Sequence, residues 1–166
     1  MKIVVKFGGS SLASAEQFKK VADIIHADPH RRFVVPSAPG KRFDGDTKVT
    51  DMLYGCYDLA EAGKDFDSAL ADIKARYDEI IEGLELDLTL DKEFETIHEQ
   101  FRLKAGRNYA ASRGEYLNGI VLANYLGFEF VDAATVIRFD DAGNFEADRT
   151  DLILSSRLKD VEYAVV

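Results

Sequence analysis

The first 36 residues alternate between two hydrophobic patterns, and this alternation is the strongest constraint on the fold. Residues 2–7 form a short apolar run rich in β-branched side chains, which predicts a strand buried on both faces. A helix should follow, capped by Ser14 and stopped by Asp28 and Pro29. Residues 32–36 predict a second strand. This spacing of strand, helix and strand is typical of a βαβ unit and therefore of a mainly parallel sheet.

The middle of the chain is helical by pattern and contains no convincing strand. Apolar side chains recur at helical spacing over 66–84 and again over 90–101, with a polar break around 85–89. We therefore expect an antiparallel helix pair, inserted over about residues 60–105. The ordinary interpretation of its charged outer faces is solvent exposure. A further helix should run from Gly106 to Leu126.

The last third of the chain returns to the α/β pattern. Strands are predicted at 128–131 and 135–139, and the turn residues at 141–144 suggest that a hairpin follows. A short helix over about 150–158 then leads to a final buried strand at 163–166. Because the chain stops inside that strand, we expect a piece of a longer protein.

Composition narrows the class of protein without indicating a chemistry. The chain has 166 residues, 46% of them hydrophobic and 31% charged, which is an ordinary globular ratio. Its net charge of −9 argues against nucleic acid as a partner. No apolar run approaches the roughly 20 residues of a membrane helix, so no membrane partner is expected. The single cysteine, Cys56, excludes an internal disulfide and favours a cytoplasmic location.

The segment Lys6-Phe7-Gly8-Gly9-Ser10-Ser11 is the strongest candidate for chemistry, because it lies where the first strand meets the first helix. Glycines allow the backbone to approach a ligand closely, and a helix N-terminus attracts anions. With the charge of Lys6, these features can form a phosphate cradle. The pattern is neither a P-loop nor a dinucleotide fingerprint. A tight turn with an incidental lysine is an equally good interpretation of the spacing alone.

The exact string decides between these interpretations, because it resembles the N-terminus of the aspartokinases of the amino-acid kinase superfamily. Further segments agree in order and position: Ser37-Ala38, Thr50-Asp51, 112–115 (Ser-Arg-Gly-Glu) and 131–133 (Val-Asp-Ala). The resemblance implies a three-layer α/β/α fold with a mainly parallel sheet, carbamate kinase-like. It further implies that residues 1–166 are the N-terminal portion of the catalytic domain, so that the fold is incomplete.

The resemblance also implies roles for individual residues. Lys6 would neutralise charge in the transition state, Ser37 and Thr50 would bind aspartate, and Glu115 would accept its α-ammonium group. The segment that would hold the nucleotide phosphates comprises Lys6, Phe7, Gly8, Gly9 and Ser10. The expected substrates are L-aspartate and ATP with magnesium. No residue is assigned to the metal, and a homo-oligomeric full-length protein is compatible with the resemblance.

Each substrate residue also has an ordinary structural interpretation. Ser37 could be only a turn residue, Thr50 only a helix N-cap, and Glu115 only an acid favoured by the helix dipole. The residues at 41–48 predict a mobile loop beside the site. Pro36 should weaken the pairing of its strand unless its nitrogen faces an unpaired position.

The resemblance implies an aspartate kinase, which phosphorylates the side-chain carboxylate of L-aspartate in the first step of lysine, threonine and methionine biosynthesis. Nothing in the chain matches the Arg-Gly-Gly-Ser-Asp segment of the family, and the nucleotide-binding half and the regulatory domains are absent. We therefore expect the isolated fragment to be inactive. The alternative hypothesis is a non-catalytic binding or scaffold module that keeps the phosphate-cradle fold.

Overall fold

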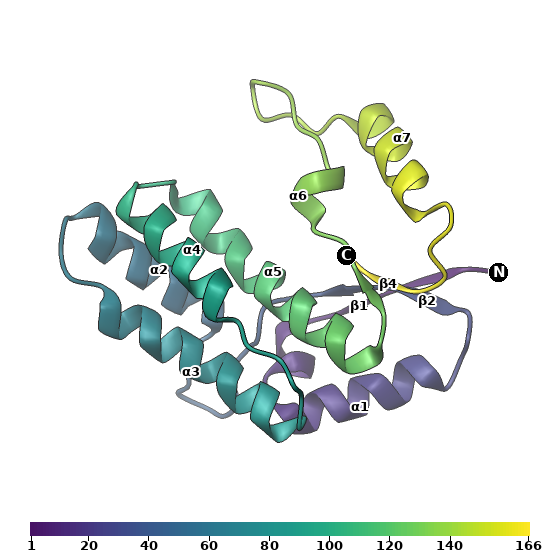
Figure 1. The fold of residues 1–166 in the computed structure, drawn as a ribbon, viewed down its shortest axis with the longest axis horizontal. Coiled ribbons are helices and arrows are strands. Elements are labelled where there is room, and N and C mark those ends of the chain that lie inside the picture. Colours follow the sequence, from purple (N-terminus) through teal and green to yellow (C-terminus); the bar gives the residue numbers. More distant parts are fainter.

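The computed structural model covers residues 1–166 and is built on a four-stranded parallel sheet of order β1-β2-β4-β3 (Figure 1). The register pairs Val5 with Val34 and Phe33 with Ala164. The strands are β1 (Ile3–Phe7), β2 (Arg31–Pro36), β3 (Glu129–Phe130) and β4 (Ala164–Val165). The α/β class, the parallel sheet and the N-terminal βαβ unit predicted from the sequence are confirmed.

Helices cover the two faces of this sheet unequally (Figure 1). Most helices pack on one side in a single core of 29 buried residues. A second core of four buried residues, which includes Phe33 and Ala164, lies on the other side. The helices of the large core are η1 (Gly9–Leu12), α1 (Ala15–His26), α2 (Val49–Glu61), α3 (Asp67–Gly83), α4 (Asp91–Arg102) and α5 (Arg107–Leu126). The small core is covered by α6 (Ala133–Val136) and α7 (Ala147–Leu158).

The local signals in the sequence account for most helix boundaries. The Ser14 side chain accepts a hydrogen bond from the Gln17 amide and so caps α1. Gly127 ends α5 with φ of 68°, a left-handed conformation that favours glycine. Helices α3 and α4 run antiparallel: Asp67 at the start of α3 pairs with His98 late in α4, whereas Lys74 farther along α3 pairs with Asp91 at the start of α4. The predicted helix pair is therefore confirmed.

The first strand departs from the prediction that both of its faces are buried. Its side chains alternate between half-buried and exposed, and Val4 is 65% exposed. The reason is that the small core reaches Phe33 of β2 but includes no residue of β1. Lys6 shares the exposed face of the strand with Val4.

The predicted strand at 135–139 is wrong. The Asp132 side chain accepts a hydrogen bond from the Ala134 amide and starts the short helix α6 instead. The expected hairpin shrinks to one antiparallel bridge between Phe139 and Phe145. Helix α7 begins earlier than predicted, at Ala147.

The sheet accommodates Pro36 because of the direction in which its nitrogen points. Val34 bonds toward β4, where its carbonyl accepts from Val166, whereas Ser37 donates to Phe7 of β1. Alternate residues of a parallel strand bond to opposite sides, so the Pro36 nitrogen points to the β4 side. The pairing of β2 with β4 involves only Phe33 and Val34, so Pro36 removes no hydrogen bond of the sheet.

Two other expectations concern burial. Cys56 is 1% exposed, and burial raises the pKa of its thiol to about 12, which suits a core residue rather than a nucleophile. None of the helices combines the length and the apolar character that a membrane crossing requires.

Candidate active site

The turn Ser37–Gly40 follows β2 at the carboxyl end of the sheet and connects the elements around it. Each of its residues bonds to a different part of the chain. The carboxyl ends of parallel strands are where open α/β sheets place their ligands. We call this turn, together with Lys6, Gly9, Glu115 and Asn118, the strand-end cluster.

Lys6 lies at the end of β1 and reaches across to the turn. Its Nζ donates to Ser37 Oγ at 3.1 Å. Both side chains retain contact with solvent, Lys6 being exposed and Ser37 half-buried. The structure thus places a positive charge and a hydroxyl together, with access for a ligand.

The glycine segment approaches the turn closely, backbone to backbone. The Gly40 amide donates to the Gly9 carbonyl at 2.8 Å. A Cβ at Gly9 would lie 2.8 Å from the Ala38 carbonyl oxygen, and one at Gly40 would lie 2.6 Å from the Gly9 carbonyl carbon. Only glycine fits this crossing, which leaves Gly8 and Ser10 exposed beside Lys6. Because η1 begins at Gly9, its first amides have no partners within the helix and can donate to an anion.

Helix α5 supplies two side chains to the turn from adjacent positions of one face. Glu115 Oε1 accepts from the Ala38 amide at 3.4 Å, and Asn118 Nδ2 donates to the Ser37 carbonyl at 2.7 Å. The helix can lie this close because a Cβ at Gly114 would meet the Ala38 Cβ at 2.6 Å. Glu115 is exposed, so its carboxylate can also accept from a bound cation.

Thr50 lies in the first turn of α2, next to the strand-end cluster. The Val49 amide donates to the Pro39 carbonyl at 3.1 Å, which fixes the start of α2 on the turn. The N-cap of α2 is Lys48 rather than Thr50, so the capping interpretation of Thr50 is wrong. Lys6, the glycine segment, Ser37, Thr50 and Glu115 therefore converge on one turn, although their roles stay predictions.

The loop 41–48 makes several contacts through charged groups, and its mobility stays a prediction. Arg42 binds Asp46 within the loop at 2.9 Å and Glu79 of α3 at 2.8 Å. Asp46 also lies 3.3 Å from Arg76. Hydrogen bonds from Arg42 hold the pKa of the Asp46 carboxyl well below its usual range.

Sequence reasoning missed three residues that hold this site: Arg76, Tyr77 and Asn118. Their exposed fractions are 5%, 0% and 0%. Burial raises the pKa of Tyr77 well above its ordinary value, and the negative charge of Glu115 adds to this effect, so its hydroxyl remains a donor. The available signal was a polar side chain at a core position of an amphipathic helix.

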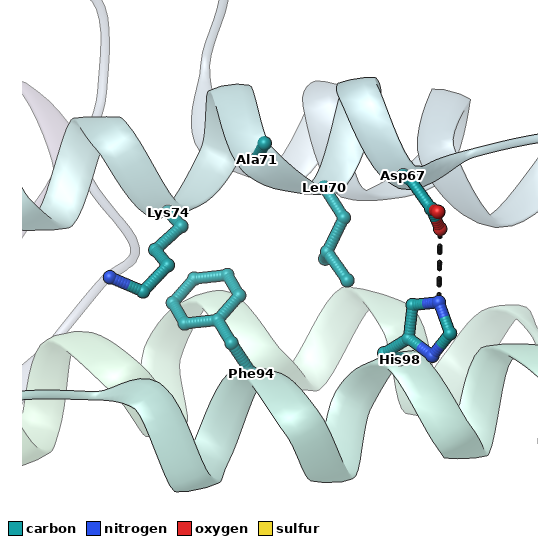
Figure 2. A pocket seen from close by; sticks show the side chains of 6 residues that line it. All are labelled: Asp67, Leu70, Ala71, Lys74, Phe94 and His98. Carbon is teal, nitrogen blue, oxygen red and sulfur yellow. Dashed lines mark hydrogen bonds and ion pairs between the residues drawn. The ribbon is translucent and has the colours of Figure 1, made fainter.

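Two other features lie outside the cluster. Arg113 stacks on the rings of Tyr109 and Tyr116, at 4.6 and 4.5 Å from their centroids, and does not contact Glu115. A groove of about 250 Å³ lies between α3 and α4. Figure 2 shows the side chains that line it. The polar side chains of the groove already have partners: His98 lies 3.0 Å from Asp67 within the groove, and Lys74 pairs with Asp78 and Asp91 outside it.

No group of three or more His, Cys, Asp or Glu side chains in the structure is arranged to hold a metal ion. The donors of the strand-end cluster are an ammonium, hydroxyls and backbone amides, which suit phosphate and carboxylate groups.

The parallel sheet with its covering helices places the chain in the class of α/β proteins. The amino acid kinase family model matches residues 1–161. The chain therefore belongs to the amino acid kinase family.

Similar proteins within that family include aspartokinases. The chain is 38% identical to aspartokinase 3 of Bacillus subtilis over 152 residues, which cover 86% of this chain and 32% of the relative. The crystal structure of Clostridium acetobutylicum aspartate kinase matches with a TM-score of 0.95 and 45% identity, covering 99% of this chain and 38% of that one. Escherichia coli aspartokinase III in complex with aspartate and ADP matches in fold, with a TM-score of 0.77, 22% identity, and 99% and 40% of the two chains covered. The chain thus spans about a third of the length of these relatives.

Proposed function

We propose that the chain forms the N-terminal portion of an aspartate kinase catalytic domain and provides its substrate side. The observation that carries this proposal is the contact between Lys6 and Ser37, made at the crossing of the glycine segment and the turn. The contact puts a cation beside a hydroxyl suited to a carboxylate, on the strand that leads into backbone amides suited to phosphate. The names of the most similar relatives support the choice of aspartate as the acceptor.

The proposed reaction is a phosphoryl transfer between two anions. A side-chain carboxylate oxygen of L-aspartate attacks the γ-phosphorus of ATP, the bond to the β,γ-bridging oxygen breaks, and 4-phospho-L-aspartate and ADP form. The carboxylate is ionised near neutral pH, so no general base is required. The work of the protein is then positioning and charge stabilisation.

The residues of this chain would divide that work by position. Lys6 would stabilise the charge that develops on the transferring group, with backbone donors of Gly8, Gly9 and Ser10 on the phosphate oxygens. Ser37 and Thr50 would hydrogen-bond aspartate. The exposed carboxylate of Glu115 would accept a hydrogen bond from the α-ammonium group of aspartate. Magnesium would arrive with the nucleotide phosphates, and no residue of this chain is assigned to it.

The test is a chimera in which residues 1–166 replace the matching segment of the C. acetobutylicum enzyme, to which the chain is 45% identical. We expect aspartate-dependent ADP release and an acyl phosphate that hydroxylamine traps as a hydroxamate. The isolated chain is expected to bind aspartate weakly and to show no useful turnover. A folded chimera that forms no hydroxamate, beside an active unmodified host, would contradict the proposal and favour a non-catalytic module.

The Glu115 assignment has its own measurement in the same chimera. Glu115→Gln should raise the KM for aspartate by roughly tenfold or more, because a charge-assisted hydrogen bond is lost, while the KM for ATP stays unchanged. Glu95→Gln, an exposed acid on α4, is the matched control. Equal KM values for aspartate in the two variants would remove Glu115 from the substrate site.

A further inference from the structure

Two consecutive residues of α3, Arg76 and Tyr77, turn their polar ends toward the strand-end cluster. Both are almost completely buried, with 5% and 0% exposure. They bind different segments. Arg76 binds the last residue of the turn Ser37–Gly40, and Tyr77 binds Gly114 of α5. A helix of the inserted pair thus contacts the candidate site through polar groups as well as through apolar packing.

Arg76 connects the two ends of the loop 41–48. Its Nη2 donates to the Gly40 carbonyl at 3.0 Å, and its Nη1 donates to the Thr47 carbonyl at 3.1 Å. Asp46 lies 3.3 Å from Nη1 and balances the charge. Arg76 thus binds the carbonyl of Gly40, while the amide of the same residue binds Gly9 in the glycine segment.

Tyr77 acts on helix α5, near the middle of that helix. Its hydroxyl donates to the Gly114 carbonyl at 2.8 Å, immediately before Glu115. At Gly114 α5 also lies so close to the turn that an added Cβ would meet the Ala38 Cβ at 2.6 Å. A hydrogen bond at this point fixes the distance between α5 and the turn. It also fixes the backbone position from which the Glu115 side chain extends.

We propose that Arg76 and Tyr77 are positioning residues of the candidate site, which hold the glycine crossing and Glu115 at a fixed separation. This inference rests on the proposed function for its catalytic consequence, but its structural part stands on the contacts alone. Neither residue touches a substrate group. Arg76 would act through Gly40, whose amide binds the Gly9 carbonyl, and Tyr77 through the Gly114 carbonyl, which directly precedes Glu115.

A purely stabilising role would not need these residue types. A buried arginine is costly to desolvate, and an apolar side chain of similar volume is often as stable or more stable at such a position. Arg76 even leaves its Nε without a partner. An apolar residue could not donate hydrogen bonds to the Gly40 and Thr47 carbonyls at the same time, as Arg76 does.

The structural part is tested on the 166-residue chain by hydrogen exchange of single amides. Tyr77→Phe should reduce the protection of the Ala38 amide, and Arg76→Lys should reduce that of the Gly40 amide, each by several-fold or more relative to the global unfolding rate. Lysine keeps a charge beside Asp46 but cannot hold both carbonyls. Unchanged local protection in both variants would overturn the proposal.

Tyr57→Phe is the matched control for Tyr77→Phe. Tyr57 is also buried and also binds one backbone group, accepting from the Gly106 amide at 2.9 Å, but at the N-cap of α5, eight residues before Gly114. Tyr57→Phe should lower the melting temperature about as much as Tyr77→Phe does, but it should leave the Ala38 amide protected from exchange. If Tyr57→Phe exposed Ala38 equally, the effect would be general loosening, and the assignment of Tyr77 would fail.

The catalytic part is measured in the chimera by separating KM from kcat. Tyr77→Phe should raise the KM for aspartate by roughly two- to tenfold, the worth of one hydrogen bond, with kcat and the KM for ATP unchanged. Arg76→Lys should raise both KM values, because Gly40 contacts the phosphate cradle. Tyr57→Phe should change neither, whereas equal KM values in all three variants would refute a positioning role.

Failure of the proposed function would look different. If the chimera lacked aspartate kinase activity while the exchange pattern held, the positioning contacts would remain and only the identity of the substrate would be wrong. If the chimera were active and the exchange pattern absent, the function would stand and the positioning proposal would fall.

Discussion

The two faces of the sheet show how differently the chain supports its parts. The strand-end cluster lies against a core of 29 buried residues and is held by buried polar groups from α3 and α5. The residues 133–158, which we call the α6–α7 unit, rest on a core of four buried residues and project from the sheet (Figure 1). Of the three buried polar side chains, Arg76 and Asn118 thus lie on the face with the larger core and hold the cluster, whereas Thr150 lies in α7.

If this difference reflects function, the cluster should contain side chains that matter for turnover and hardly at all for stability. Lys6→Ala is the largest expected effect. In the chimera, turnover should fall by at least about a hundredfold, as when one preorganised donor is removed from a transition state. The unfolding free energy should change by less than about 0.5 kcal/mol, because Lys6 is exposed. Steady-state kinetics and urea titration measure the two quantities.

Lys2→Ala is the control for that experiment, because Lys2 is exposed and precedes the same strand at its opposite end. It should leave turnover unchanged. A Lys6→Ala enzyme that kept most of its turnover would remove the central element of the proposed cradle.

The same substitution on the two faces measures the packing difference directly. Leu122→Ala in α5 should cost about 2–5 kcal/mol of unfolding free energy, since its side chain is fully buried in the large core. Leu158→Ala in α7 should cost about 1 kcal/mol, since that side chain is only partly buried against the small core. Chemical denaturation of the 166-residue chain gives both values.

Hydrogen exchange provides an independent check on this pair. Amides of α7 should exchange through local opening, at a lower free energy than those of α5, and Leu158→Ala should widen that gap. Equal losses of stability from the two substitutions, with equal protection of α5 and α7, would show that the two faces form one cooperative unit.

The sequence predicted well what local signals determine. The βαβ unit followed from hydrophobic periodicity, the start of α1 from Ser14, and the end of α5 from Gly127. The antiparallel α3–α4 pair also followed from periodicity alone. Family resemblance then selected residues that the fold does bring to one turn, though their chemical roles stay predictions.

The contacts that hold the site could not be predicted, because they join segments far apart in the sequence. Arg76 lies 36 residues from Gly40 and Asn118 lies 81 residues from Ser37, and no local pattern encodes either pairing. The segment 135–139 failed for a different reason. Its apolar residues suit a strand, but capping by Asp132 and packing under α7 favour the short helix α6.

The smallest expected effect is the loss of stability in acid. It can be compared between one carboxyl beside the strand-end cluster and one in the α6–α7 unit. Asp46, beside the cluster, has a pKa lowered chiefly by its hydrogen bonds with Arg42, and Asp140, in the α6–α7 unit, has one lowered chiefly by its hydrogen bond with Asn144. A carboxyl whose pKa is lower in the folded state binds more protons when unfolded, so stability rises with pH. The contribution of each is therefore complete above about pH 4 and is lost as the pH falls below it.

The two carboxyls should nevertheless differ in how far this loss spreads. Asp46→Asn should cost about 1–3 kcal/mol at pH 7, because the side chain is 9% exposed and binds Arg42 and Arg76, and the difference from the unsubstituted chain should shrink toward pH 3. Asp140→Asn should change global stability less at either pH, since Asp140 is exposed and its contacts stay within the turn 140–144. Urea titrations at both pH values measure this. If Asp140→Asn were the more costly substitution at pH 7, the α6–α7 unit would be as firmly coupled to the fold as the strand-end cluster, and the contrast between the two faces would not hold.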